Sequence, residues 1–227
     1  SRKELTMTTA IQNTQHEFWL QRWDANQIGF HREQINELLQ RYYPSTILPA
    51  NPRTLVPLCG KSKDMLWLSA QGASILGCEL SPSACEQFFI ENQLGAARNQ
   101  DKNFQYFQHD TITLACGDFF ALPLEIAGEL DFCYDRAALV ALPADLRQIY
   151  AQKIAQLLPS GSLYLLITLS YSDLARIAPP YSIEHAEVEN LYAHNFTIQH
   201  LETLAEQATS PPQKSPVDNH VYLLKRK

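Results

Sequence analysis

The sequence predicts an α/β fold in which a mainly parallel sheet is covered by helices on both faces. Strand-like apolar runs alternate with helical runs from residue 54 to residue 168, which is typical of βαβ units with right-handed crossovers. A turn with a single glycine, Gly60, follows the first strand-like run, and an acidic residue, Glu79, ends the second. An acid about twenty positions beyond such a turn is the arrangement by which doubly wound folds hold a ribose.

The individual elements follow from periodicity and from proline and glycine breaks. Strands are predicted at residues 54–58, 74–78, 112–116, 130–134, 162–168, 197–204 and 220–225. Helices are predicted at residues 16–23, 32–43, 64–71, 83–93, 144–158 and 183–194. A more polar stretch, residues 95–110, separates the second βα unit from the third strand. The last two strands suit a hairpin, so we expect a single-domain, seven-stranded Rossmann-like sheet with an antiparallel C-terminal strand.

Composition narrows the function classes. With 45% hydrophobic and 19% charged residues in a 227-residue chain, we expect one soluble domain and no membrane association. The net charge of −6 argues against a nucleic-acid partner, because such proteins cluster basic residues. Five cysteines without a C-x-x-C pair predict core thiols in a reducing, cytoplasmic setting. No signal peptide is evident, and we expect a monomer.

The domain is expected to span residues 16–227, with an N-terminal helical lid at residues 16–44. Residues 1–15 are expected to be a disordered tail, in which residues 1–6 are a remnant ahead of a natural start at Met7.

Candidate ligand residues follow the strands, because the ligand of an open α/β sheet lies at the carboxyl ends of its strands. The turn at Gly60 lacks the G-x-G-x-x-G of a dinucleotide site, which favours S-adenosylmethionine over NAD. Glu79 would hold the ribose, Asp118 and Phe119 the adenine, and Arg136 the methionyl carboxylate, since guanidinium binds carboxylates bidentately. Structural alternatives are a strand-end acid at Glu79, a helix N-cap at Asp118 and a local Asp135–Arg136 salt bridge.

The N-terminal segment carries aromatic residues at Phe18, Trp19, Trp23 and Phe30. At helical spacing these would ordinarily be core residues, but their position outside the βαβ core also allows a lid over the cleft. The histidines show no metal-ligand spacing, so no metal site is expected.

Together the motifs resemble the thiopurine S-methyltransferase family, in a bacterial-type form, from residue 16 onward. The matching motifs are FWLQRW at 18–23, IGFH at 28–31, VPLCGKSKDMLWL at 56–68, GCELS at 77–81, YDRAALVAL at 134–142, LSY at 169–171 and APPYSIEHAEVENLY at 178–192.

The resemblance implies a class I methyltransferase fold that uses S-adenosylmethionine and releases S-adenosylhomocysteine. Implied cofactor contacts are Trp19, Trp23, Leu58, Glu79, Asp118, Phe119 and Arg136, with Arg136 also positioning the reactants without a covalent nucleophile. Implied substrate contacts are Phe30, Pro180 and Tyr181, with Pro179 beside them. The implied reaction is methyl transfer to the sulfur of thiopurines or other aromatic or heterocyclic thiols. Selenium or tellurium species are the alternative acceptors, and a nicotinamide-dependent oxidoreductase and a non-catalytic binding module are the rival classes.

Overall fold

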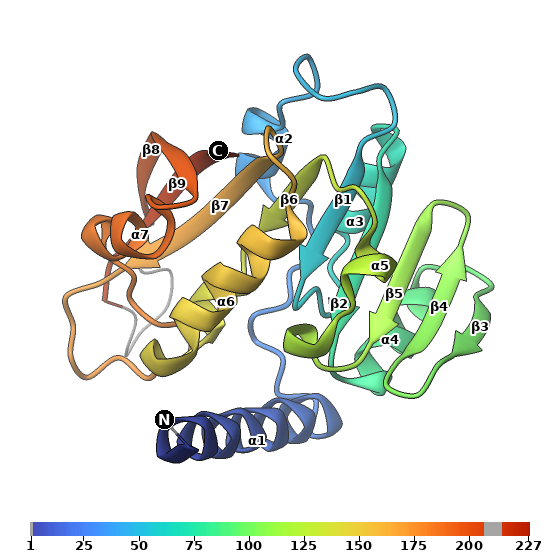
Figure 1. Cartoon of the computed structure of the whole chain (residues 1–227), viewed down its shortest axis with the longest axis horizontal. Helices are drawn as coiled ribbons and strands as arrows, with labels where there is room; N and C mark the ends of the chain where they lie inside the picture. Colours follow the sequence, from blue (N-terminus) through green and yellow to red (C-terminus); the bar gives the residue numbers. More distant parts are fainter. Residues whose placement is uncertain (1, 207–214) are drawn as a thin grey trace.

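A computed structural model describes residues 2–206 and 215–227 of the chain as one α/β domain (Figure 1). Within these residues nine strands form one sheet in the order β3-β4-β5-β2-β1-β6-β7-β9-β8. The five central strands, from β5 to β7, are parallel, and antiparallel pairs lie at both edges. The strands are β1 (Arg53–Pro57), β2 (Ser74–Glu79), β3 (Ala97–Gln100), β4 (Gln105–His109), β5 (Ile112–Cys116), β6 (Phe132–Asp135), β7 (Leu163–Ser170), β8 (Phe196–Glu206) and β9 (Val217–Arg226).

Helices cover both faces of the sheet, as the alternating sequence pattern predicts. One face packs against α2 (Glu37–Tyr42), α3 (Asp64–Ala70) and α4 (Pro82–Glu91), and the other against α5 (Leu124–Ala127), α6 (Ala144–Leu157) and α7 (His185–Tyr192). Successive strand residues alternate between the two cores: Leu55 lies in one and Val56 in the other. This is the period of two that places neighbouring side chains on opposite faces.

Local sequence explains where these helices begin. Ser81 is the N-cap of α4 and its hydroxyl accepts the Ala84 N–H at 3.2 Å, with Pro82 in the first turn. Asn36 caps α2, and its Oδ1 accepts the N–H groups of Leu38 and Leu39. Side-chain oxygens at these positions satisfy N–H groups that have no partner inside the helix.

The seven predicted strands are confirmed, and β3 and β4 are added to them. The polar stretch at residues 95–110 forms this antiparallel pair, which extends the sheet beyond β5. All four residues of β3 are exposed, and Phe107 is the one buried residue of β4. Because this edge hairpin buries so little, its sequence lacks the alternating apolar pattern by which strands are predicted. The two strands are held by backbone hydrogen bonds, which no side-chain pattern reveals.

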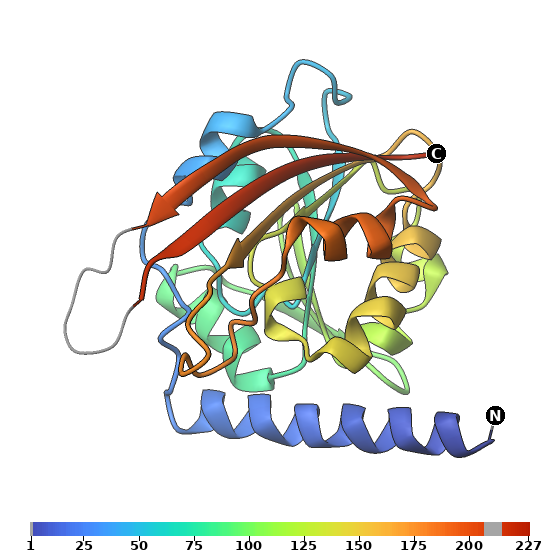
Figure 2. The same ribbon diagram turned by 90° about the vertical axis from the view of Figure 1, so that its left-hand side faces the viewer.

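The expectation of a disordered tail at residues 1–15 is wrong for residues 2–15. Helix α1 spans Arg2–Asp24 and continues through the predicted tail (Figure 2). The segment contains no glycine or proline, so nothing in it stops a helix. Once the aromatic C-terminal half is helical, each further residue is added with one more backbone hydrogen bond and no new nucleation step. Ile11, halfway along α1, packs against the core on the α6 side of the sheet.

Among the described residues no helix is both long enough and apolar enough to cross a bilayer. All five cysteines are buried and unpaired.

Candidate active site

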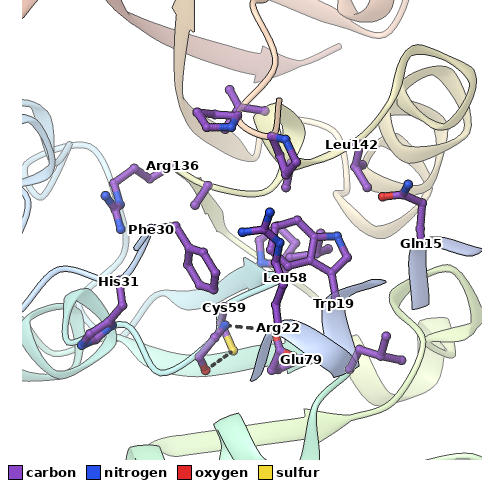
Figure 3. A pocket seen from close by; sticks show the side chains of 18 of the residues that line it. Gln15, Trp19, Arg22, Phe30, His31, Leu58, Cys59, Glu79, Arg136 and Leu142 are labelled. Atoms are coloured by element: carbon purple, nitrogen blue, oxygen red, sulfur yellow. Dashed lines mark hydrogen bonds between the residues drawn. The ribbon is translucent and has the colours of Figure 1, made fainter. Parts of the chain in front are cut away.

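One cavity of about 1060 Å³ opens at the carboxyl ends of β1, β2, β5, β6 and β7. Its volume lies at the upper end of the range for small-molecule sites, which leaves room for two ligands side by side. Nine of the ten predicted site residues line it: Trp19, Trp23, Phe30, Leu58, Glu79, Asp118, Phe119, Arg136 and Pro180. Figure 3 shows Phe30 and Arg136 on one side, Trp19 on the other and Glu79 below them.

Glu79 ends β2 and ties the turn after β1 to the turn after β2. One carboxylate oxygen accepts the Gly60 N–H at 3.2 Å and the other accepts the Ser81 N–H at 2.6 Å. Gly60 has a φ of 53°, and a Cβ there would lie 3.0 Å from Cζ2 of Trp23. A residue other than glycine would therefore be strained and would press on the aromatic residue that covers the turn.

Glu79 as a whole residue is only 7% exposed. Burial raises its pKa to about 7, against the opposing effect of the N–H groups of Ser81 and Gly60. A carboxylate in this setting carries remaining lone pairs that can accept two hydroxyl groups of a ligand. Glu79 is thus a buried carboxyl at the cavity wall and not the exposed strand-end acid of the structural alternative.

Asp118 and Phe119 follow β5, and the predicted N-cap at Asp118 is confirmed. Its Oδ1 accepts the Phe120 N–H at 2.9 Å, which makes it the N-cap of the short helix η1 (Phe119–Ala121). It also lines the cavity, with Nε2 of His16 at 3.6 Å. The cap fixes the carboxylate at the cavity wall, where its second oxygen is available to a ligand donor.

Arg136 extends into the cavity from the end of β6, and its charge is only loosely compensated. Its Nε lies 3.8 Å from Oδ2 of Asp64. The Asp64 carboxylate accepts two shorter hydrogen bonds, from the Tyr134 hydroxyl at 2.7 Å and from the Asn36 N–H at 2.9 Å. The guanidinium therefore keeps most of its five N–H donors for an anionic ligand group.

The predicted alternative of a local Asp135–Arg136 salt bridge is wrong. Asp135 is 1% exposed and accepts the hydroxyls of Tyr150 and Tyr164, at 2.6 and 2.7 Å. Its other oxygen accepts the N–H groups of Ala138 and Leu139. Alternation along β6 explains the difference, because adjacent residues at the strand end point to opposite sides.

The N-terminal aromatic residues form a continuous wall. The ring of Phe30 lies edge-on to Trp19 and Trp23, with centroids 5.5 and 5.4 Å apart. Nε1 of Trp19 is buried and has no hydrogen-bond partner within the described residues. A buried donor without a partner at a cavity wall is a site for a ligand acceptor, because it is costly when left unsatisfied.

His31, next to Phe30, also lines the cavity. Burial, and then the positive charge of Lys61, lower its pKa below the ordinary value, against the effect of nearby Glu33. The imidazole is therefore neutral near pH 7 and able to accept a proton.

The loop after β7 forms the opposite end of the cavity. Pro179 and Pro180 line it, whereas Tyr181 does not. The Tyr181 ring instead stacks with Arg147, whose Cζ lies 5.1 Å from the ring centroid, and its N–H donates to the Val140 carbonyl. The expected substrate contact of Tyr181 is thus not supported by the structure.

Sequence reasoning missed several residues that line the cavity. They include Gln12 and Gln15 on α1, Leu142 before α6, Arg176 in the loop after β7, and Ser215 and Val217 at the start of β9. Leu142 ends the motif at 134–142 but was not singled out, and the others lie outside the motifs and away from the predicted strand ends. Their positions depend on how α1 and two loops pass the edge of the sheet.

Comparison with known proteins finds relatives over nearly the whole chain. The family described as thiopurine S-methyltransferase (TPMT) matches residues 14–227. A thiopurine S-methyltransferase of Shewanella sp. (strain MR-4) is 41% identical over 214 residues, covering 92% of this chain and 98% of that protein. One of Xanthomonas campestris pv. campestris (strain 8004) is 45% identical over 186 residues, covering 82% and 85%. A crystal structure of an S-adenosylmethionine-dependent methyltransferase from Anabaena variabilis ATCC 29413 has the same fold, with a TM-score of 0.65 at 14% identity over 93% of this chain and 95% of that chain.

Proposed function

The chain belongs to the thiopurine S-methyltransferase family, and we propose that it transfers the methyl group of S-adenosylmethionine to the sulfur of thiopurines or other aromatic and heterocyclic thiols. The observation that carries the proposal is one continuous cavity. Its walls include the predicted cofactor residues at the carboxyl ends of the strands and, beside them, the apolar side chains of Phe30, Pro179 and Pro180. A flat apolar acceptor fits between such walls.

The residues fit the cofactor by their donors and acceptors. Glu79 accepts the ribose hydroxyls, and Asp118 with Phe119 holds the adenine. Arg136 provides donors for its carboxylate, and the unpartnered Trp19 Nε1 provides a donor on the other side of the cavity. Trp23 and Leu58 are apolar contacts. When bound, S-adenosylmethionine supplies a methyl group already activated by a sulfonium charge.

The remaining task of the protein is to position the thiol and to exclude water. Phe30 and Pro180 orient the acceptor ring, while the positive charge of Arg136 favours the thiolate form. The neutral imidazole of His31 lies on the same wall as Phe30 and can take up the thiol proton. No covalent intermediate with the protein is needed.

The site is proposed to work in a monomer in the cytoplasm. Five buried, unpaired cysteines support a reducing compartment.

Transfer of a radiolabelled methyl group should separate the possible acceptors. We expect turnover with mercaptopurine and thiophenols, and binding of S-adenosylhomocysteine but not of NAD in calorimetry. Turnover with selenium or tellurium oxyanions alone would instead select the alternative acceptor class. Binding of NAD without binding of S-adenosylhomocysteine would contradict the methyltransferase proposal.

A second expected result concerns pH. Because the pKa of Glu79 is raised to about 7 by burial, the free protein carries a proton there below pH 7, whereas ribose hydroxyls donate to the ionised carboxylate. Binding at lower pH must therefore release this proton, and affinity for S-adenosylhomocysteine should fall about tenfold from pH 8 to pH 6.

The matched control for this titration is Glu79→Gln. It keeps the shape and every other titrating group, so its affinity should be lower at pH 8 and should lack the Glu79 part of the pH dependence. Calorimetry in buffers of different ionisation enthalpy measures the proton release directly. Identical pH profiles for the two proteins would show that Glu79 does not hold the ligand.

A further inference from the structure

Arg176 is a positive group at the end of the cavity formed by the loop after β7, remote from Glu79 in the sequence and in the sheet order. Its Nη1 donates to the Ser215 carbonyl at 3.0 Å, and its Cζ lies 5.1 Å from the centre of the Tyr171 ring. These two contacts join the loop after β7 to the start of β9. The side chain is therefore held in place rather than free in solvent.

In the part of the chain that the structure describes, no carboxylate compensates the charge of Arg176. Among the described residues no acidic side chain forms an ion pair with it, although Asp173 and Glu206 also line the cavity. Asp173 Oδ1 accepts the Ala175 N–H at 2.9 Å, and Glu206 Oε2 accepts the Asn219 amide at 3.1 Å. A guanidinium with four remaining donors and a fixed position suits a planar, bidentate anion.

Ser215 supplies a second polar group at the same place. Its carbonyl orients Arg176, and its hydroxyl oxygen is buried without a hydrogen-bond partner in the part of the chain that the structure describes. Buried hydroxyls without partners are uncommon, because leaving one unsatisfied costs about 1–3 kcal/mol. A ligand oxygen that accepts from this hydroxyl and from Arg176 would satisfy both.

The same loop carries the proline wall of the acceptor site. The Tyr171 hydroxyl donates to the Pro180 carbonyl at 2.8 Å, so the ring under Arg176 also fixes the position of Pro180. Tyr171 thus links Arg176 to the apolar wall. Arg176 and Pro180 line the same cavity, so an acceptor ring against Pro180 shares that cavity with the guanidinium.

We propose that Arg176 and Ser215 form a subsite for a carboxylate on the methyl acceptor, at a ring position away from the thiol. This makes Arg176 a specificity-determining residue that selects anionic aromatic thiols over neutral ones. The inference rests on the proposed function, because it assigns this end of the cavity to the acceptor.

The test compares para-mercaptobenzoate with para-methylthiophenol, in which an uncharged methyl group replaces the carboxylate. In the unsubstituted protein the Michaelis constant for para-mercaptobenzoate should be the lower of the two. Arg176→Gln should raise that constant about 10- to 100-fold, the range expected for losing a charge-assisted bidentate contact. It should change kcat and the Michaelis constant for para-methylthiophenol less than about threefold.

Three further variants sharpen the comparison. Arg176→Lys, which keeps the charge and loses the planar fork, should restore part of the affinity for para-mercaptobenzoate. Ser215→Ala should weaken the apparent affinity for this thiol severalfold. Arg98→Gln is the matched control, since Arg98 pairs with Glu86 on the surface and does not line the cavity, and both Michaelis constants should stay unchanged.

Equal changes in the Michaelis constants for the two thiols in Arg176→Gln would overturn the subsite, because they would show that Arg176 only supports the loop. An unchanged constant for para-mercaptobenzoate would overturn it as well. If neither thiol is methylated, the proposed function fails.

The subsite is then tested by calorimetry, which measures the binding of both thiols to the complex of the protein with S-adenosylhomocysteine. Tighter binding of para-mercaptobenzoate that is lost in Arg176→Gln supports the subsite, and equal binding of the two thiols contradicts it.

Discussion

Asp135→Ala is expected to lower the free energy of unfolding by about 4 kcal/mol, which is a large share of the roughly 5–15 kcal/mol of a typical domain. The variant removes the acceptor for four donors in a site closed to water: the hydroxyls of Tyr150 and Tyr164 and the N–H groups of Ala138 and Leu139. Each buried donor without a partner costs about 1–3 kcal/mol, and relaxation of the site recovers part of the sum. Urea denaturation followed by circular dichroism measures the change.

Asp135→Asn is the matched variant for this prediction. It keeps the shape and one acceptor oxygen for the two N–H groups, and the tyrosine hydroxyls can rotate to accept from the new amide. We expect a loss of about 1–2 kcal/mol. Equal stability of Asp135→Ala and the unsubstituted protein would show that the buried carboxylate is not what fixes the segment after β6.

The consequence for function is indirect, since Asp135 does not line the cavity while its neighbour Arg136 does. The two hydrogen bonds that Asp135 accepts hold the backbone N–H groups of residues 138 and 139, two and three positions after Arg136. In Asp135→Asn we therefore expect a modest rise in the Michaelis constant for the cofactor at nearly unchanged cooperativity of unfolding.

The sheet and the strand-end residues of the cavity could be predicted because both depend on local patterns. Parallel strands of known order bring their carboxyl ends together, so Leu58, Glu79, Asp118 and Arg136 had to meet once the strands were assigned. The orientation of each side chain could be predicted less well from the sequence. Asp135 and Arg136 are adjacent in sequence, and only the packing of β6 between two cores decides that the first is buried and the second reaches the cavity.

The proposed acceptor side was less predictable, for a physical reason. Its walls come from Phe30, which follows α1, and from two segments around β7 and β9. The paths of these segments follow from tertiary contacts rather than from propensity. The Arg176–Ser215 contact joins residues 39 positions apart, and the difference between Pro180, which lines the cavity, and Tyr181, which does not, is a single residue in an irregular loop. No periodicity specifies such a choice.

The proposed lid gives the last prediction. Helix α1 lies along one side of the domain beneath α6, as Figure 2 shows, and most of its described side chains are exposed or only partly buried. Trp23, 4% exposed, is the one fully buried residue among those described in α1, yet neither Trp23 nor Trp19 belongs to either core cluster. A helix with one fully buried residue among those described should open at low cost and be stabilised by a ligand that contacts it.

Hydrogen exchange on the whole chain should therefore find the amides of α1 poorly protected without ligand. Saturating S-adenosylhomocysteine should slow their exchange at least about tenfold, since binding stabilises the closed form by mass action.

Removal of residues 1–24 should reduce turnover about a thousandfold, because Trp19 and Trp23 are lost and water enters the site. The remaining domain should still unfold cooperatively, since both core clusters consist of buried residues outside α1. Removal of residues 1–9 is the matched control: every residue that lines the cavity is retained, and turnover should stay within about threefold. Constant protection of α1 with and without ligand, together with loss of cooperative unfolding on removal of residues 1–24, would instead make α1 part of the folded core.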